Sequence, residues 1–132
     1  MSKEKFTSEF EINSSPKLLF PYLNTPGGLS QWFADDVNVG SNRVLKFLID
    51  GEELFGKIVS QKSNDYIKIE YLDESKNEVE DPDYTKIALE VNELTGSTYL
   101  VATDYCDYIE SQEDHHELWE GLVDNLKDIV GA

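Results

Sequence analysis

The histidine pair His115–His116 is the most suggestive grouping of reactive side chains in the sequence. Neighbouring residues of a helix are rotated by about 100° from each other, so the two rings are poorly placed to chelate one metal ion. His115 precedes Trp119 and Leu122 at helical spacing, which predicts that it lies on the apolar side of a helix. Such a histidine could act as a base or donate a hydrogen bond to a ligand. The more ordinary interpretation is a partly buried histidine bonded to a carboxylate.

Acidic clusters are abundant, but none has the spacing of a metal or catalytic motif. Neither Asp35–Asp36 nor the acidic run over 104–114 matches a calcium-binding loop, and no Cys/His spacing suits zinc. The one cysteine, Cys106, has acidic neighbours that disfavour the thiolate. No nucleophile elbow or glycine-rich phosphate loop occurs. We therefore expect no catalytic residue, no metal and no cofactor, and hence a protein that is not an enzyme.

Trp32 and Phe33 are adjacent aromatic residues that follow Pro26–Gly27–Gly28 and precede a pair of aspartates. Two such rings in a short segment belong to the core, to the wall of a ligand site or to a partner surface. Core is the ordinary role, and a ligand wall is the main alternative. A buried tryptophan normally needs a partner for its indole N–H, and the sequence alone does not name one.

The composition excludes several partners. The 132 residues include 27 acidic and 11 basic side chains, for a formal net charge of −16. This charge argues against nucleic acids and anionic membranes, and it is compatible with a basic protein partner. The length suits one domain over 1–132. With one cysteine, no secretory signal and no long apolar run, we expect a cytoplasmic monomer that does not insert into membranes.

Hydrophobic periodicity defines the elements that must position these residues. Apolar residues alternate with polar ones in six segments, which predicts strands over 6–12, 43–49, 54–59, 67–71, 85–91 and 99–103. Helical spacing and Ser-Pro or Pro-Gly signals predict helices over 16–23, 29–33 and 113–129. The Asp50–Gly51 pair favours a hairpin, and 73–83 is expected to be an exposed loop. Short turns between successive strands imply an antiparallel meander across which the last helix packs.

Three stretches of this pattern resemble the START-like (SRPBCC) superfamily. They are FEINSSPKLLF (10–20), TPGGLSQWF (25–33) and LWEGLVDNL (118–126). Within the superfamily, the resemblance is to small bacterial proteins of the heat-shock-90 ATPase-activator-like branch. It implies an α+β helix-grip fold: a curved antiparallel sheet of about six strands wrapped around a long C-terminal helix, with two short helices after the first strand. Trp32 and Phe33 would then lie near the mouth of an internal cavity.

The resemblance also suggests where a ligand would bind, because this fold encloses a space between the sheet and the long helix. Alternation within the strands and spacing within the helices predict the residues that line it: Trp32, Phe33, Phe47, Ile49, Ile67, Ile69, Tyr71, Leu89, Tyr99, Val101, His115, Trp119 and Leu122. These are large side chains, so they either fill the interior or leave a usable void, and the sequence leaves both alternatives open.

Three functional hypotheses follow. The first is a noncatalytic domain that binds a small hydrophobic or amphipathic ligand, lipid-like or aromatic, in the internal cavity. The second is a protein-interaction module, such as a regulator of a heat-shock-90-type chaperone, that uses its acidic surface against a basic partner. The third is an enzyme, because proteins of this fold include cyclases; His115 or Tyr71 would be its candidate polar residues.

Overall fold

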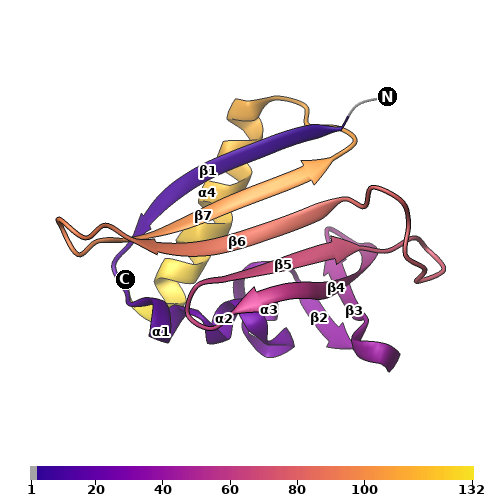
Figure 1. Ribbon diagram of the computed structural model, residues 1–132, viewed down its shortest axis with the longest axis horizontal. Coiled ribbons are helices and arrows are strands. Elements are labelled where there is room, and N and C mark those ends of the chain that lie inside the picture. The colour runs from indigo at the N-terminus through magenta and orange to yellow at the C-terminus, as the bar shows by residue number, and fades with distance from the viewer. Residues whose placement is uncertain (1–2) are drawn as a thin grey trace.

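The computed structural model describes residues 3–132 and contains a seven-stranded antiparallel sheet, three short helices and a long C-terminal helix (Figure 1). The elements are β1 (Glu4–Ile12), α1 (Pro16–Leu19), α2 (Pro21–Asn24), α3 (Pro26–Trp32), β2 (Asp36–Val39), the 3-10 helix η1 (Ser41–Arg43), β3 (Leu45–Ile49), β4 (Glu52–Lys62), β5 (Tyr66–Tyr71), β6 (Tyr84–Val91), β7 (Thr98–Cys106) and α4 (Gln112–Val130).

The order of the strands in the sheet is β1-β7-β6-β5-β4-β3-β2. Strands β3 to β7 therefore form the predicted meander, β2 extends it at one edge, and β7 pairs with β1 at the other. Because β1 and β2 lie at opposite edges, the connection through α1, α2 and α3 must cross the width of the sheet. The three short helices are thereby held at the same face as α4 (Figure 1).

The prediction of about six strands missed β2. This edge strand has only four residues, and Val37 is the only one of them that is buried. A short edge strand with a single inward side chain has too little alternation to identify it in the sequence. The Asp50–Gly51 hairpin is confirmed, since both residues have positive φ, as the favoured two-residue turn requires.

The boundaries predicted for the short helices were wrong. Pro21, which has no N–H to donate, divides the predicted helix 16–23 into α1 and α2. Helix α3 begins at Pro26 rather than at Leu29, because Thr25 caps the N–H of Gly28. A Cβ atom on Gly28 would lie 2.2 Å from the carbonyl oxygen of Pro21, so glycine permits the close approach of α2 and α3.

The predicted orientation of β7 was also wrong. Tyr99 and Val101 were expected to face the interior, but the buried residues of this strand are Thr98, Leu100 and Ala102. Because successive residues of this strand are apolar, the sequence is compatible with either alternating set of side chains facing the interior. Pairing decides between them, because Leu100 lies opposite Phe10 of β1 and Leu89 of β6, both of which are buried. Tyr99 and Val101 therefore lie on the outer face of the sheet.

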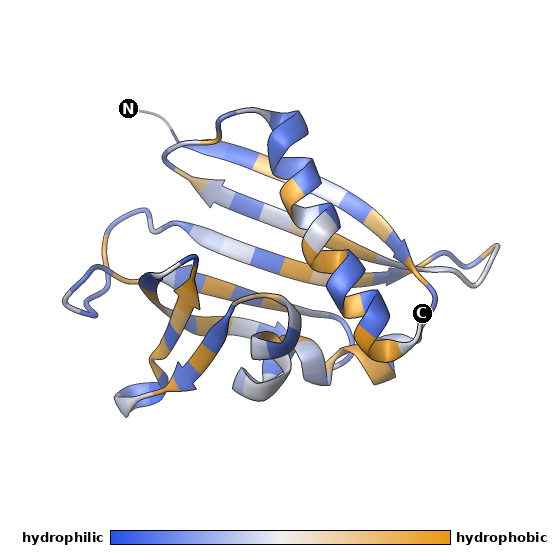
Figure 2. Cartoon of the chain, turned by 180° about the vertical axis from the view of Figure 1, so that it is seen from behind, coloured by the Kyte–Doolittle hydropathy of each residue, from blue (hydrophilic) through white to orange (hydrophobic). Residues whose placement is uncertain are grey.

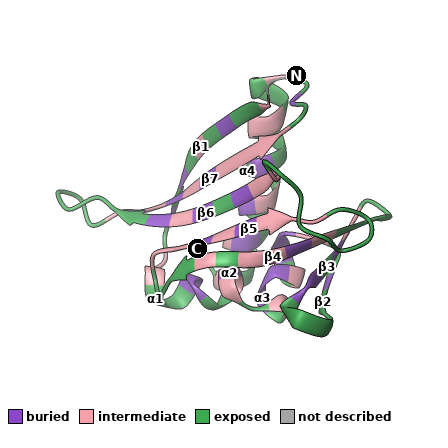
Figure 3. Cartoon of the chain, turned by 45° about the vertical axis from the view of Figure 1, so that its right-hand side comes forward, coloured by how far each residue is buried: buried purple, intermediate pink, exposed green. Residues whose placement is uncertain are grey.

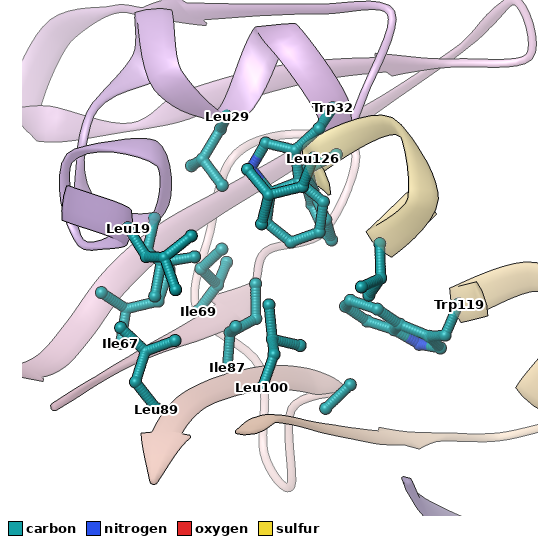
Figure 4. Packing of buried hydrophobic residues seen from close by; sticks show 14 of the residues in the cluster. Leu19, Leu29, Trp32, Ile67, Ile69, Ile87, Leu89, Leu100, Trp119 and Leu126 are labelled. Carbon is teal, nitrogen blue, oxygen red and sulfur yellow. The ribbon is translucent and has the colours of Figure 1, made fainter. Parts of the chain in front are cut away.

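Helix α4 lies across the concave face of the sheet and turns its apolar side toward it (Figure 2). Trp119, Val123 and Leu126 are buried beneath it, whereas Leu118, assigned to the apolar stripe from the sequence, is 56% exposed. Burial is concentrated between the sheet and the helices, and the segment after β5 is exposed as predicted (Figure 3). The core joins aliphatic side chains of the sheet to Trp32 and Trp119 of the helices (Figure 4).

Candidate ligand pocket

A pocket of about 740 Å³ lies where α3 and α4 meet the ends of β3, β5, β6 and β7. Four inward-facing aromatic residues contribute to its lining: Trp32, Phe33, Tyr71 and Trp119. We call this space the aromatic pocket. The rings of Trp32, Phe33 and Trp119 contact one another, with centroid distances of 5.8 to 6.3 Å, so the wall is a continuous aromatic cluster.

Trp32 and Phe33 serve both as core and as pocket wall. Their exposed fractions are only 3% and 6%, yet both line the pocket. The indole Nε1–H of Trp32 donates to the backbone carbonyl of Tyr22 at 2.9 Å, which supplies the partner that the sequence could not name. This bond fixes the ring between α2 and α4. Phe33 packs edge-on against Phe47 of β3.

Asp104, near the end of β7, is the polar centre of the pocket. Its carboxylate accepts hydrogen bonds from Thr85 Oγ1 at 2.6 Å, His115 Nε2 at 2.7 Å and Trp119 Nε1 at 2.8 Å. These bonds connect β6, β7 and α4, and they compensate for placing a carboxylate where its side chain is only 18% exposed. Asp104 therefore positions the Trp119 ring in the wall of the pocket.

The hydrogen bonds around Thr85 have a definite direction. Its one hydroxyl proton is donated to Asp104, so Thr85 must accept from the hydroxyl of Tyr71, whose oxygen lies 2.8 Å away. Burial, and next the negative charge of Asp104, raise the pKa of the Tyr71 phenol above its ordinary value of 10. Tyr71 therefore stays neutral, and its oxygen keeps free lone pairs toward the pocket.

The two histidines pack against β1 rather than into the pocket. The His115 ring meets the edge of Phe6, and its bond to Asp104 confirms the ordinary interpretation of a partly buried histidine paired with a carboxylate. His116 stacks on Phe10 and is hydrogen-bonded to Ser8. Both rings thus contribute to the contact between α4 and the sheet.

The mouth of the pocket is acidic. Asp35, Asp50 and Asp83 join Asp104 in its lining, which contains no lysine, arginine or histidine among residues 3–132. Within residues 3–132, Asp83 forms a salt bridge to Lys3 at 2.8 Å and Asp104 pairs with His115, whereas Asp35 and Asp50 have no basic partner. Cys106 also lines the pocket, and burial raises the pKa of its thiol.

The structure brings together about half of the residues predicted for the cavity. Six of them line the aromatic pocket: Trp32, Phe33, Ile49, Tyr71, Trp119 and Leu122. Four others are packed in the core beside it: Phe47, Ile67, Ile69 and Leu89. The remaining three do not line it, because Tyr99 and Val101 face outward and His115 lies behind Asp104.

Sequence reasoning missed the most connected residue of the site, Asp104, together with Thr85. A usable signal existed in β7, because Asp104 is in phase with Leu100 and Ala102. A charged residue that continues the inward alternation of a buried strand requires polar partners. The error in the phase of β7 concealed this signal.

A second hollow, of about 730 Å³, lies at the opposite end of α4. It is lined by loop residues such as Asn13, Ser14 and Ser97 and contains no aromatic side chain. Its volume is similar, so the chemistry of the lining, rather than its size, distinguishes the aromatic pocket. Among residues 3–132, no three potential metal-ligating side chains cluster, and no helix is long and apolar enough to cross a membrane.

Comparisons with known proteins agree with this architecture. The Aha1 dimer from Colwellia psychrerythraea has a similar fold, with a TM-score of 0.70 and 21% identity, over 95% of this chain and 94% of that one. Protein BfR322 from Bacteroides fragilis has a TM-score of 0.61 and 32% identity, over 98% and 93%. Protein MLL2253 from Mesorhizobium loti has a TM-score of 0.71 and 13% identity, over 97% of each chain.

No protein with a curated description matches the sequence significantly. The model of the START-like superfamily domain, in contrast, matches residues 1–132. The observed curved antiparallel sheet, the short helices after β1 and the C-terminal helix together constitute the helix-grip architecture expected from the resemblance. The chain therefore belongs to the START-like superfamily.

Proposed function

We propose that this protein binds a small hydrophobic or amphipathic molecule in the aromatic pocket. The observation that supports the proposal is a space of about 740 Å³ that combines an apolar wall of Trp32, Phe33 and Trp119 with an acidic mouth. Ligand sites of drug-sized molecules have volumes of about 300–1,000 Å³ and predominantly apolar walls. The remaining pocket residues would complete an enclosure for an alkyl or aromatic body.

The proposed role is binding without turnover. A general acid or base needs a proton position directed at the substrate. Here the hydroxyl proton of Thr85 and the indole N–H of Trp119 are both directed at Asp104, and His115 is bonded to the same carboxylate. These groups hold the pocket walls in place, which suits a binding site.

The test uses three reporters that the chain already contains. Its two tryptophans, Trp32 and Trp119, and its one cysteine, Cys106, all line the pocket. Octyl compounds that differ in head group should change tryptophan fluorescence and slow alkylation of Cys106 by iodoacetamide at mildly alkaline pH. Native mass spectrometry of protein from its own cells should show a stoichiometric apolar adduct. An apo mass, unchanged fluorescence and unprotected Cys106 would together contradict the proposal.

A second candidate function is a protein-interaction module. The exposed side of α4 bears Glu117, Glu120 and Asp124, and such a surface suits a basic partner. The similar fold of the Aha1 dimer makes a heat-shock-90-type chaperone the partner to test. Titration with the purified chaperone, with its ATPase rate as readout, should respond to neutralisation of these three residues. An identical response of the neutralised variant would contradict this candidate.

We also propose that the cytoplasmic monomer is the binding form, because one chain supplies every wall of the pocket. Light scattering after size exclusion, with and without octyl compounds, measures the oligomeric state directly. A ligand-bound dimer would overturn this part of the proposal.

A further inference from the structure

The hydrogen-bond donors that line the aromatic pocket are largely used within the protein. Trp32 donates to Tyr22, Trp119 and Thr85 donate to Asp104, and Ser30 donates to the carbonyl of Gly27. Tyr71 donates to Thr85, as the single proton of that hydroxyl requires. Among the lining side chains of residues 3–132, the neutral amides of Gln31 and Asn125 and the hydroxyl of Tyr84 keep free donors.

The acceptors, in contrast, remain available. Tyr71 has two lone pairs that its bond to Thr85 does not use. Asp104 accepts one bond at Oδ1 and two at Oδ2, so Oδ1 has capacity for another donor. Asp50 is exposed at the mouth, and its side chain makes no hydrogen bond within residues 3–132. The pocket therefore offers electron-rich oxygen atoms, which suit either a hydrogen-bond donor or a positively charged group.

The charges of the lining favour the same kind of ligand. Asp35, Asp50 and Asp104 have no lysine or arginine partner within the described chain, and Asp83 alone is neutralised by Lys3. Two lysines lie near lining residues: Lys3 is paired with Asp83, and Lys68 stacks on the Tyr84 ring and pairs with Glu70. An anionic head group would meet uncompensated negative charge and few free donors, whereas a cation would be attracted.

The aromatic walls complete the pattern. Faces of Trp, Tyr and Phe attract an organic cation within about 6 Å of the ring centroid, and Trp does so most strongly. Trp32 and Trp119 come from different helices, with centroids 6.3 Å apart, and the carboxylate of Asp104 lies beside Trp119. Aromatic rings combined with carboxylates recognise ammonium groups, including quaternary ones, on an apolar body.

We propose that the ligand of the aromatic pocket is an amphipathic organic cation, an amine or quaternary ammonium attached to an apolar chain or ring. The inference rests on the proposed ligand-binding function and specifies the chemical class of the ligand. The apolar body packs on Trp32, Phe33 and Leu122, and the cationic group lies toward Asp104, Asp35 and Asp50.

The experiment compares three probes of equal chain length: octyltrimethylammonium, 1-octanol and octanoate, each below its critical micelle concentration. None absorbs where tryptophan does, so the fluorescence of Trp32 and Trp119 reports binding directly. We expect the cation to bind at least about tenfold more tightly than the alcohol, and octanoate to bind most weakly. The preference should decrease as ionic strength rises.

A pair of isosteric variants tests whether the charges of the pocket cause this preference. Asp35→Asn/Asp50→Asn keeps the shape of the mouth, and Asn tolerates the positive φ of Asp50. We expect its affinity for octyltrimethylammonium to fall about tenfold, with little change for 1-octanol. The matched control, Glu93→Gln/Asp128→Asn, removes two exposed charges outside the pocket and should retain the affinity.

The outcomes separate the two proposals. If 1-octanol or octanoate binds as tightly as the cation, the inference about charge is overturned while the ligand-binding function stands. An equal loss of cation affinity in both double variants would also overturn it, because net charge alone would then explain the attraction. If no probe changes the fluorescence or protects Cys106, the ligand-binding function itself is contradicted.

Discussion

The space between the sheet and α4 has two ends that differ in chemistry. At one end lie the start of β5, the end of β6 and the start of β7, where Ile67, Leu89 and Leu100 pack with Leu19 (Figure 4). At the other end lie the opposite termini of the same strands. Tyr71, Thr85 and Asp104 occupy them, beneath the aromatic rings of α3 and α4.

The difference shows how one sheet can serve both stability and binding. Aliphatic side chains fill the first end at the density of an interior, and this burial stabilises the fold. At the second end, the aromatic rings of α3 and α4 border the pocket, and the hydrogen bond from Trp119 to Asp104 fixes one of these rings. The predictions below test whether stability depends on the first end and ligand binding on the second.

Leu100→Ala should have the largest effect on stability. Leu100 is fully buried between β1, β6 and α4, so its truncation leaves a cavity that costs about 2–5 kcal/mol. Urea denaturation measures this loss, and the affinity of the remaining folded protein for octyl probes should be unchanged. A loss below 1 kcal/mol, as a rough bound for surface positions, would show that this end is not the stabilising core.

Asp104→Asn should destabilise the protein by about 1–3 kcal/mol and also weaken ligand binding. The amide has the shape of the carboxylate, but it cannot accept all the bonds from Thr85, His115 and Trp119. Thermal unfolding and a titration of the tryptophan fluorescence measure the two effects. Asp124→Asn, on the exposed side of α4, is the matched control and should leave both quantities unchanged.

Leu122→Trp should reduce ligand affinity with little loss of stability. Leu122 lines the pocket and is only partly buried, so a larger ring has space to enter. We expect the affinity for octyl probes, measured by calorimetry, to fall at least tenfold while stability changes by less than about 1.5 kcal/mol. Leu94→Trp adds the same ring at a position that is 96% exposed, and it should bind like the wild type.

Tyr71→Phe should have the smallest effect on stability at neutral pH, and its effect should become measurable at alkaline pH. The pKa of Tyr71 is raised above 10 in the folded state. Below pH 10 the phenol is therefore neutral in both the folded and the unfolded chain, and its ionisation does not change the stability. As pH rises above 10 the unfolded chain releases a proton that the folded chain retains, so stability falls by up to about 1.4 kcal/mol per pH unit.

Tyr71→Phe lacks the phenolic proton of Tyr71. Its free energy of unfolding should therefore decrease less steeply between pH 9 and 11 than that of the wild type. Denaturation at a series of pH values measures the slopes. Tyr66→Phe, on the outer side of β5, serves as the comparison, because it removes a tyrosine without removing the group whose pKa is raised. Equal slopes in wild type and Tyr71→Phe would show that Tyr71 ionises as readily folded as unfolded.

The sequence predicted most of the strands, the long helix and the family, because their signals are local. Alternation in β5 and β6, the Asp50–Gly51 turn and the spacing of Trp119 and Leu126 all depend on nearby residues. Of the thirteen residues it predicted for the cavity, six line the pocket. The sequence-based prediction failed for β7, because both faces of that strand bear apolar residues. It also failed for β2, because that strand is too short to show an alternating pattern.

Only the tertiary structure decided which polar groups meet. Tyr71, Thr85 and Asp104 come from three strands, and Trp119 comes from a helix further along the chain. Their distances depend on strand register and on the position of α4, which long-range packing fixes and which no local pattern encodes. The sequence thus determined an acidic START-like protein with two adjacent aromatic residues, and the fold placed those residues in the wall of a pocket that also contains Tyr71, Thr85 and Asp104.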